Sequence, residues 1–260
     1  MTARQLALKV LYAVDKENAF TGIELKKQLS ASDLSGVDKA FATELVYGVV
    51  KNRTRLDYII SKYSKQKLKK ISPWIINILR MGVYQLIFLD KIPSSAAVNE
   101  SVKLAKRYGH QASSGFVNGV LRNVDRNGDV EYPKGRDYYE VYYSHPKWLV
   151  DMLFDQYGED AKGIIENNNK VPVTTVRVNV LKTNSKDVTK FLEKKGVAVK
   201  NTEFENVLQI ADYGDISKLP EYKGTENLYP EFPTVNTEDF IRKVSLLDKE
   251  AMLEYLFVFY

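Results

Sequence analysis

Residues 72–89 read SPWIINILRMGVYQLIFL, and this stretch decides the fold. Ser72-Pro73 is typical of a helix start, with Ser72 as the N-cap and Pro73 at the first helical position. The residues from Trp74 to about Leu89 are apolar nearly all round a helix, which is typical of a helix that is buried on most sides. The sequence therefore predicts a central helix against which the other helices pack.

Helical periodicity continues on both sides of this stretch. Apolar residues recur at helical spacing over 3–14, 37–50 and 55–63, and again over about 95–109 and 112–124. Ser94 or Ser95 is expected to cap the fourth of these helices, which stops at Gly109. Gly115 and Gly119, four residues apart, are expected to pack closely against a neighbour. The short connections favour a compact helical bundle.

The pattern changes after residue 126. Residues 126–143 are polar and rich in turn formers, which marks a boundary. Beyond it, helices are expected near 146–153, 159–168 and 185–195, and alternating valines predict strands at 176–180, 197–199 and 207–211. The fold class is therefore mainly α: a helical bundle followed by a small α+β unit of ferredoxin-like or RRM-like type. Residues 223–260 form a divergent, turn-rich tail that is expected to be poorly ordered.

Composition limits the classes of function. No apolar run reaches the roughly 20 residues that span a bilayer, and the N-terminus lacks a signal-peptide cleavage site. The absence of cysteine excludes disulfides, cysteine-ligated metals and cysteine nucleophiles, and only two histidines are present. These features predict a cytoplasmic protein with no membrane partner and no metal site.

Charge is unevenly distributed along the chain. Residues 1–130 hold 21 Lys and Arg against 11 Asp and Glu, whereas residues 131–260 hold 17 against 22. Such asymmetry indicates that the first half faces a polyanion, and RNA is the candidate. A solvated basic loop is an equal explanation for the run that ends at Lys70. The expected RNA contacts are Lys51, Arg53, Arg55, Lys62, Lys65 and Lys67 in and before that run, then Lys103, Lys106, Arg107 and Arg122.

Four blocks of the first half resemble the NusB-like helical domain: ALKVLYAV, DKAFATELVYGVVKNRTRLDYII, ILRMGVYQLIFLDKIPSSAAVNESVKLAK and FVNGVLRNV. In the second half, SHPKWLV, ENNNKVP and VRVNVLK resemble the Sun/Fmu (RsmB) family. Its members are S-adenosylmethionine-dependent methyltransferases that make 5-methylcytosine in small-subunit ribosomal RNA. The resemblance implies a NusB-like RNA-binding domain at 1–128 and a small α+β domain at 144–222. It also adds Arg4 and Lys9 to the expected RNA contacts.

The family pattern stops after Tyr222. The family continues into a cofactor domain with a glycine-rich loop and two catalytic cysteines, and neither follows here. Attack on cytosine C6 requires a thiolate. The resemblance therefore implies that the chain is inactive alone and contains no catalytic, cofactor-binding or metal-binding residue. S-adenosylmethionine is the cofactor of the full-length family members. We interpret the chain as the RNA-binding part of a truncated or decayed member.

Five further residues carry the family pattern and have structural explanations. Arg80 lies in the most apolar helix and is expected to pair with a carboxylate such as Glu44 or Glu100, or with helix-end carbonyls. Asn118 is expected to brace a turn, and His145 to cap a helix. Arg177 and Asn179 are expected on one strand face, opposite the valines. By resemblance they help join the unit to the catalytic domain and RNA, although packing within the unit is the expected role here.

Two other functions stay open. A NusB-like chain could be a protein-protein and RNA module in transcription antitermination or ribosome assembly, with a ribosomal or antitermination protein as partner. It could also be a methyltransferase that a separate catalytic domain completes in trans.

Overall fold

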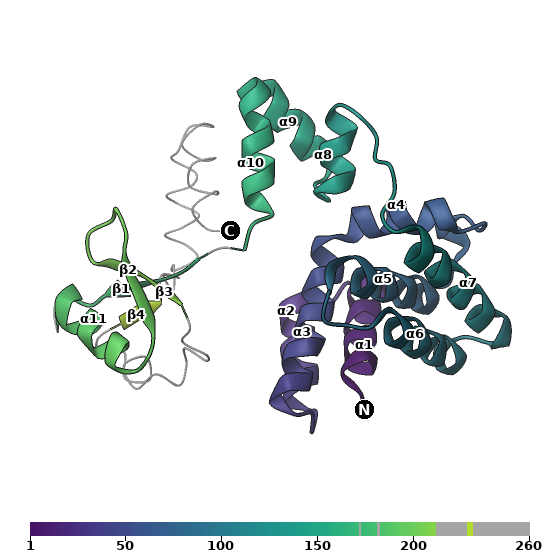
Figure 1. Ribbon diagram of the computed structural model, residues 1–260, viewed down its shortest axis with the longest axis horizontal. Helices are drawn as coiled ribbons and strands as arrows, with labels where there is room; N and C mark the ends of the chain where they lie inside the picture. The colour runs from purple at the N-terminus through teal and green to yellow at the C-terminus, as the bar shows by residue number, and fades with distance from the viewer. Residues whose placement is uncertain (172, 181–182, 212–227, 231–260) are drawn as a thin grey trace. The chain divides into compact units, whose positions relative to one another are not determined.

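The computed structural model describes residues 1–171, 173–180, 183–211 and 228–230. The chain divides into two compact units, Met1–Lys170 and Val171–Tyr260 (Figure 1). Most of the divergent tail expected at 223–260 lies outside the described residues. The domain limits at 128 and 144 that we expected from the sequence remain a proposal.

The first unit is built from helices. Each helical periodicity predicted for residues 3–124 corresponds to a helix, whereas α2 and α8 were not predicted. Their weak signal has a physical reason, since α2 buries only Leu25 and α8 buries no residue. The helices are α1 (Ala3–Lys16), α2 (Thr21–Ser30), α3 (Gly36–Lys51), α4 (Arg53–Tyr63), α5 (Pro73–Phe88), α6 (Ser94–Tyr108), α7 (Gln111–Asn127), α8 (Arg136–Tyr142), α9 (Lys147–Tyr157) and α10 (Ala161–Asn168).

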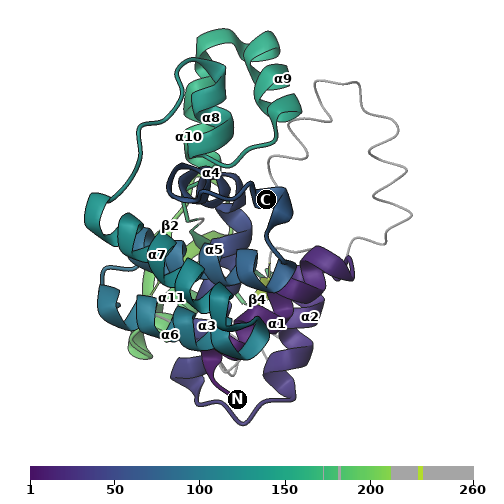
Figure 2. The same cartoon turned by 90° about the vertical axis from the view of Figure 1, so that its right-hand side faces the viewer.

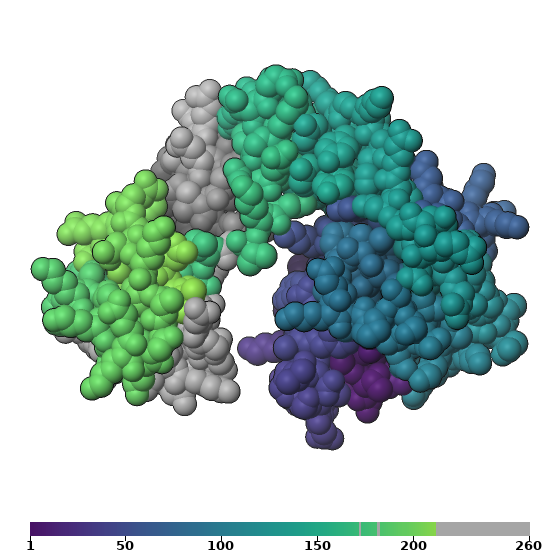
Figure 3. Space-filling view, in the orientation of Figure 1, coloured from purple at the N-terminus to yellow at the C-terminus, as the bar shows by residue number. Residues whose placement is uncertain are grey.

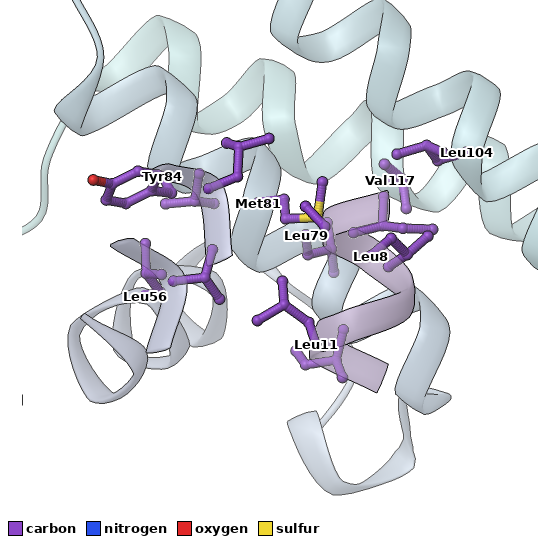
Figure 4. Packing of buried hydrophobic residues seen from close by; sticks show 14 of the residues in the cluster. Leu8, Leu11, Leu56, Leu79, Met81, Tyr84, Leu104 and Val117 are labelled. Carbon is purple, nitrogen blue, oxygen red and sulfur yellow. The ribbon is translucent and has the colours of Figure 1, made fainter. Parts of the chain in front are cut away.

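Helix α5 lies at the centre of the bundle, as predicted (Figure 2). Every residue from Ile75 to Gln85 is buried, and α5 packs against α1, α3, α4, α6 and α7. Figure 4 shows side chains of α1, α4, α6 and α7 gathered around Leu79 and Met81. Ser72 is the N-cap residue, but its side chain makes no capping hydrogen bond. The predicted serine cap of α6 is wrong, because Pro93 occupies that position and both serines lie inside the helix.

One residue of this apolar helix, Arg80, is a buried cation. Arg80 donates from Nε and Nη2 to the two oxygens of Asp57, at 2.7 and 2.8 Å, and from Nη1 to Asp15 Oδ2 at 2.7 Å. Burial alone would lower the pKa of Arg80, but the two aspartates reverse this effect and raise it. Arg80 therefore pairs with carboxylates, but these are Asp15 and Asp57 and not the expected Glu44 or Glu100. Glu44 instead accepts a hydrogen bond from the Tyr84 hydroxyl at 2.5 Å.

One glycine permits a close helix contact. A Cβ placed on Gly48 in α3 would lie 2.0 Å from Cζ of Tyr84 in α5, so this crossing requires glycine. Gly115 and Gly119 have no heavy atom within 4 Å of such a Cβ. The close packing predicted for that pair is therefore wrong.

Helices α8, α9 and α10 extend the first unit beyond the bundle. They surround a small core of Val150, Leu153, Ala161 and Ile165. Helix α8 contacts α4, so the surface of these helices adjoins the bundle (Figure 3).

The second unit is an antiparallel sheet with a helix. Strands β1 (Thr174–Val178), β2 (Ala198–Asn201), β3 (Val207–Ala211) and β4 (Leu228–Pro230) take the order β2-β3-β1-β4. Helix α11 (Ser185–Lys194) covers one face, where Val188 and Leu192 pack against residues of β1 and β3. The prediction for 207–211 matches β3, while β1 and β2 are displaced by one or two residues. No described helix is both long and apolar enough to cross a membrane.

Replacing Arg80 with Met leaves Asp57 without its cation and removes one of the two arginines that pair with Asp15. We expect the free energy of unfolding, measured by urea titration, to fall by about 3 kcal/mol. This is the lower end of the range for breaking a buried ion pair, since the Asp57 side chain is 26% exposed. Arg122→Met on the surface of α7 is the matched control and should cost less than about 0.5 kcal/mol. If the two variants lose the same free energy of unfolding, the stabilising role of the Arg80 ion pairs is contradicted.

Gly48, which lies against Tyr84, can be compared with Gly115, which has no neighbour at its Cβ position. Gly48→Ala should lower the free energy of unfolding by about 1–3 kcal/mol, because Tyr84 must move to admit the methyl group. Gly115→Ala should be neutral or stabilising by up to about 1 kcal/mol, since alanine is the better helix former. Chemical denaturation of both variants checks the difference, and a neutral Gly48→Ala would refute the close crossing.

Candidate nucleic-acid interface

Arg4 is held against the bundle rather than free in solvent. Its Nε donates to Gln85 Oε1 at 2.7 Å, and the guanidinium lies 4.8 Å from the Phe41 ring centroid. Burial lowers the pKa of Arg4, and the nearby Glu100 acts in the opposite direction. Lys103 pairs with Glu100 at 2.6 Å. The fold therefore places Arg4 and Lys103, which are distant in sequence, in the electrostatic field of the same carboxylate.

Other cations expected to contact RNA on this part of the bundle are exposed. Lys9 lies on α1 and Lys106 on α6, and neither forms an ion pair within the described part of the chain. Arg107 lies 5.8 Å from the Tyr108 ring centroid. On α7, Arg122 donates to Asn118 Oδ1 at 3.2 Å, so Asn118 orients a surface arginine instead of bracing a turn.

A stack of three aromatic rings joins α1, α5 and α6, and the sequence did not reveal it. Tyr12 and Trp74 are 3.8 Å apart between ring centroids, and Trp74 and Tyr108 are 4.8 Å apart. All three rings are partly exposed. Each helix supplies a single ring, so no local sequence pattern marks the stack. The exposed Arg107 lies next to it, which places a cation beside an aromatic surface.

The cations that precede the basic run form hydrogen bonds or ion pairs with other groups of the protein. Lys51 donates to the carbonyl oxygen of Asn169 at 2.8 Å, and Arg53 pairs with Asp15 at 2.9 Å. Arg55 is the most enclosed, with 11% of its side chain exposed. These three side chains hold parts of the first unit together, and Arg55 has little surface left for a phosphate.

Arg55 fastens the segment that follows α7 onto α4. It pairs with Asp129, donates from Nε to the Tyr132 hydroxyl at 2.7 Å, and lies 4.0 Å from the Tyr142 ring centroid. The Tyr132 hydroxyl donates in turn to Asp129. Burial first, and then Asp129, raise the pKa of Tyr132, so the phenol remains a donor at neutral pH.

The cations at the other end of α4 are exposed. Lys62 lies 4.7 Å from the Tyr58 ring centroid, and its ammonium makes no ion pair among the described residues. Lys65 and Lys67 are likewise exposed and unpaired in the part of the chain that the structure describes. The expected RNA-contact cations of residues 51–67 therefore divide into a group that stabilises the fold (Lys51, Arg53 and Arg55) and a group that can bind an anion (Lys62, Lys65 and Lys67).

His145 is buried and contacts the protein backbone. Its Nδ1 lies 2.9 Å from the Tyr143 carbonyl oxygen, and the N-cap of α9 is Pro146, so the predicted cap is wrong. Burial, assisted by Lys51, lowers the pKa of His145. Among the described residues, no group of three or more His, Asp or Glu side chains could hold a metal ion.

The two residues expected on one strand face separate in the second unit. Arg177 is exposed on β1 and pairs in register with Val207 and Tyr229. Asn179 lies one residue beyond the end of β1 and is only 5% exposed. The expectation of a shared face is therefore wrong, because the strand ends before Asn179.

Comparison with known proteins also divides the chain into two parts, but the division lies between residues 126 and 145 and not at residue 170. Residues 1–126 match the NusB family, and residues 145–217 match the ferredoxin-like domain of RsmF/B-like methyltransferases. A crystal structure of PH0851 has a TM-score of 0.62, covering 89% of this chain and 53% of that chain. Its identity of 16% supports similarity of fold alone.

Two curated relatives show the relationship at sequence level. Probable ribosomal RNA small subunit methyltransferase B of Bacillus subtilis is 36% identical over 76% of this chain and 45% of its own length. Transcription antitermination protein NusB of Bacillus licheniformis is 36% identical over 47% of this chain and 93% of its own length. The chain thus spans less than half the length of the methyltransferase relative. It belongs to the NusB family and joins a NusB domain to an RsmF/B-like ferredoxin-like domain.

Proposed function

We propose that this chain binds ribosomal RNA and that its NusB domain docks on the phosphate backbone. The observation that carries the proposal is a set of exposed cations that form no ion pair within the described part of the chain. RNA is the polyanion named by the relatives, which are ribosomal RNA small subunit methyltransferases. The set comprises Lys9, Lys62, Lys65, Lys67, Lys106, Arg107 and Arg122.

Exposed lysine and arginine bind phosphates by displacing condensed counterions, so such binding weakens as salt rises. Cations already paired with a carboxylate contribute less, because a phosphate must compete with the existing partner. The paired cations Arg53, Arg55 and Lys103 are therefore expected to contribute little to the salt dependence. The unpaired ones define the docking surface.

The described residues do not fit S-adenosylmethionine, the cofactor that the family resemblance implies. All three strand pairings of the sheet are antiparallel, and the connection from β1 to α11 contains no glycine. A nucleotide-type site would require a glycine-rich turn between a strand and the helix that receives the ligand. No step of methyl transfer is therefore assigned to this chain, and its proposed role is RNA docking.

A protein-docking role is a second candidate. Five exposed apolar side chains on or beside α2 and α3 favour it: Phe20, Ile23, Val37, Tyr47 and Val50. The partner would be a ribosomal or antitermination protein, in line with the NusB relatives. Pull-down with purified candidate proteins after RNase treatment separates the two functions. Retention by the native chain and loss in Phe20→Ser/Ile23→Ser would support protein docking, and loss after RNase would refute it.

The main proposal predicts a specific change in salt dependence. Lys106→Ala/Arg107→Ala should weaken binding to small-subunit ribosomal RNA fragments. It should also reduce the slope of log K against log salt by about 1.4–1.8, or about 0.7–0.9 for each phosphate contact. Filter binding over a series of salt concentrations measures both quantities.

Lys27→Ala/Lys103→Ala is the matched control, since it removes the same charge from two lysines that already pair with Glu24 and Glu100. We expect it to change the slope by much less. Equal effects of the two double variants would refute the assigned surface. Absence of affinity for the native chain at low salt would refute RNA binding altogether.

A further inference from the structure

An open cleft of about 470 Å³ lies between α4 and the segment that follows α7. This volume is within the range of small-ligand sites and can hold a nucleobase with part of its ribose. Both walls belong to the first unit. The cleft is lined by Tyr58, Lys62, Tyr63, Asp129, Val130, Glu131, Tyr132 and Pro133.

The walls of this cleft are held in place by hydrogen bonds within the protein. The hydroxyls of Tyr58 and Tyr63 each donate to a backbone carbonyl, of Glu131 and Gly128 respectively, at 3.2 Å. Tyr132 is fixed by Arg55 and Asp129. The phenol hydroxyls are therefore occupied, and the aromatic rings are the surfaces left for a ligand.

Tyr58 is the ring best placed to receive a base. It stacks with Tyr132 at 5.7 Å between centroids, and Lys62 Nζ lies 4.7 Å from its centroid. An exposed ammonium–ring contact changes an equilibrium constant by about 2- to 5-fold, whereas base–aromatic stacking changes it by about 5- to 150-fold. A base can therefore displace the lysine, whose freed ammonium is then available to a phosphate.

The rim of the cleft matches the remaining groups of a nucleotide. Lys65 and Lys67 are exposed, lie within five residues of Lys62 along the chain, and can contact the phosphate backbone. Glu131 is exposed, and its carboxylate can accept a hydrogen bond from an amino group of a base. The charge of Asp129 is already balanced by Arg55, so it does not oppose the RNA strongly.

From this arrangement we infer that the cleft binds an unpaired nucleobase of RNA, with Tyr58 as the stacking platform. The inference rests on the proposed RNA-binding function and makes it more specific. A base inside a duplex is stacked on both faces and cannot enter the cleft, so the site selects loops, bulges or single strands. Lys62, Lys65 and Lys67 then contact the adjoining phosphates.

Two RNAs of equal length test the inference: a perfect duplex, and a hairpin with one unpaired 2-aminopurine in its loop. Tyr58→Leu should weaken binding of the hairpin by about 5- to 150-fold and abolish the fluorescence change that follows stacking of the probe. Its affinity for the duplex should stay within twofold of that of the native chain. Tyr58→Phe keeps the ring and loses only the 3.2 Å hydrogen bond to the Glu131 carbonyl oxygen, so it should bind the hairpin much more tightly than Tyr58→Leu.

Trp148→Leu is the matched control, because Trp148 is an exposed aromatic residue of α9 that does not line the cleft. It should leave hairpin binding unchanged. If Tyr58→Leu binds the hairpin like the native chain, or Tyr58→Phe is equally impaired, the stacking role is overturned. A native chain that binds neither RNA refutes the proposed function, whereas duplex binding without a Tyr58 effect refutes only this inference.

Discussion

Arg80 carries a positive charge into the most apolar helix of the chain, where an unpaired cation would cost several kcal/mol. Its fork of donors is satisfied by Asp57 on α4 and Asp15 on α1. Asp15 also pairs with Arg53 at the start of α4. Three helices are therefore tied at one point, and the hydrogen-bond geometry of a planar guanidinium limits how they can rotate. This constraint sets the direction in which α4 leaves the core.

The direction of α4 determines the part of the candidate interface that surrounds the cleft. Arg55 lies two residues before Asp57, and it binds the segment after α7 through Asp129 and Tyr132. Tyr58 and Lys62 follow on the same helix and line the cleft. One helix thus provides the core contact, the fastening of the segment and two residues of the cleft wall, Tyr58 and Lys62. A loss of order at Arg80 would be transmitted to all of these through α4.

The sequence predicted the parts of the fold that depend on local periodicity. Helix α5 and strand β3 were found because their apolar patterns are continuous over the whole element. Helices α2 and α8 were missed because they bury one residue and none. The close crossing was assigned to Gly115 and Gly119 from their spacing, yet it occurs at Gly48. Its partner Tyr84 belongs to another helix, which spacing within one helix cannot reveal.

For the charged residues of the candidate site too, the sequence could not predict which of them form contacts with distant parts of the chain. The sequence identified the cationic half of the chain, but Arg55 and Lys62 look alike there and differ completely in the structure. Asp129, which occupies Arg55, is 74 residues away along the chain, so no local pattern distinguishes the two cations. Net charge consequently overstates the charge available to RNA, because part of it is neutralised in holding helices together. The salt dependence of binding should follow the exposed, unpaired cations and not the total of 21 basic residues in the first 130.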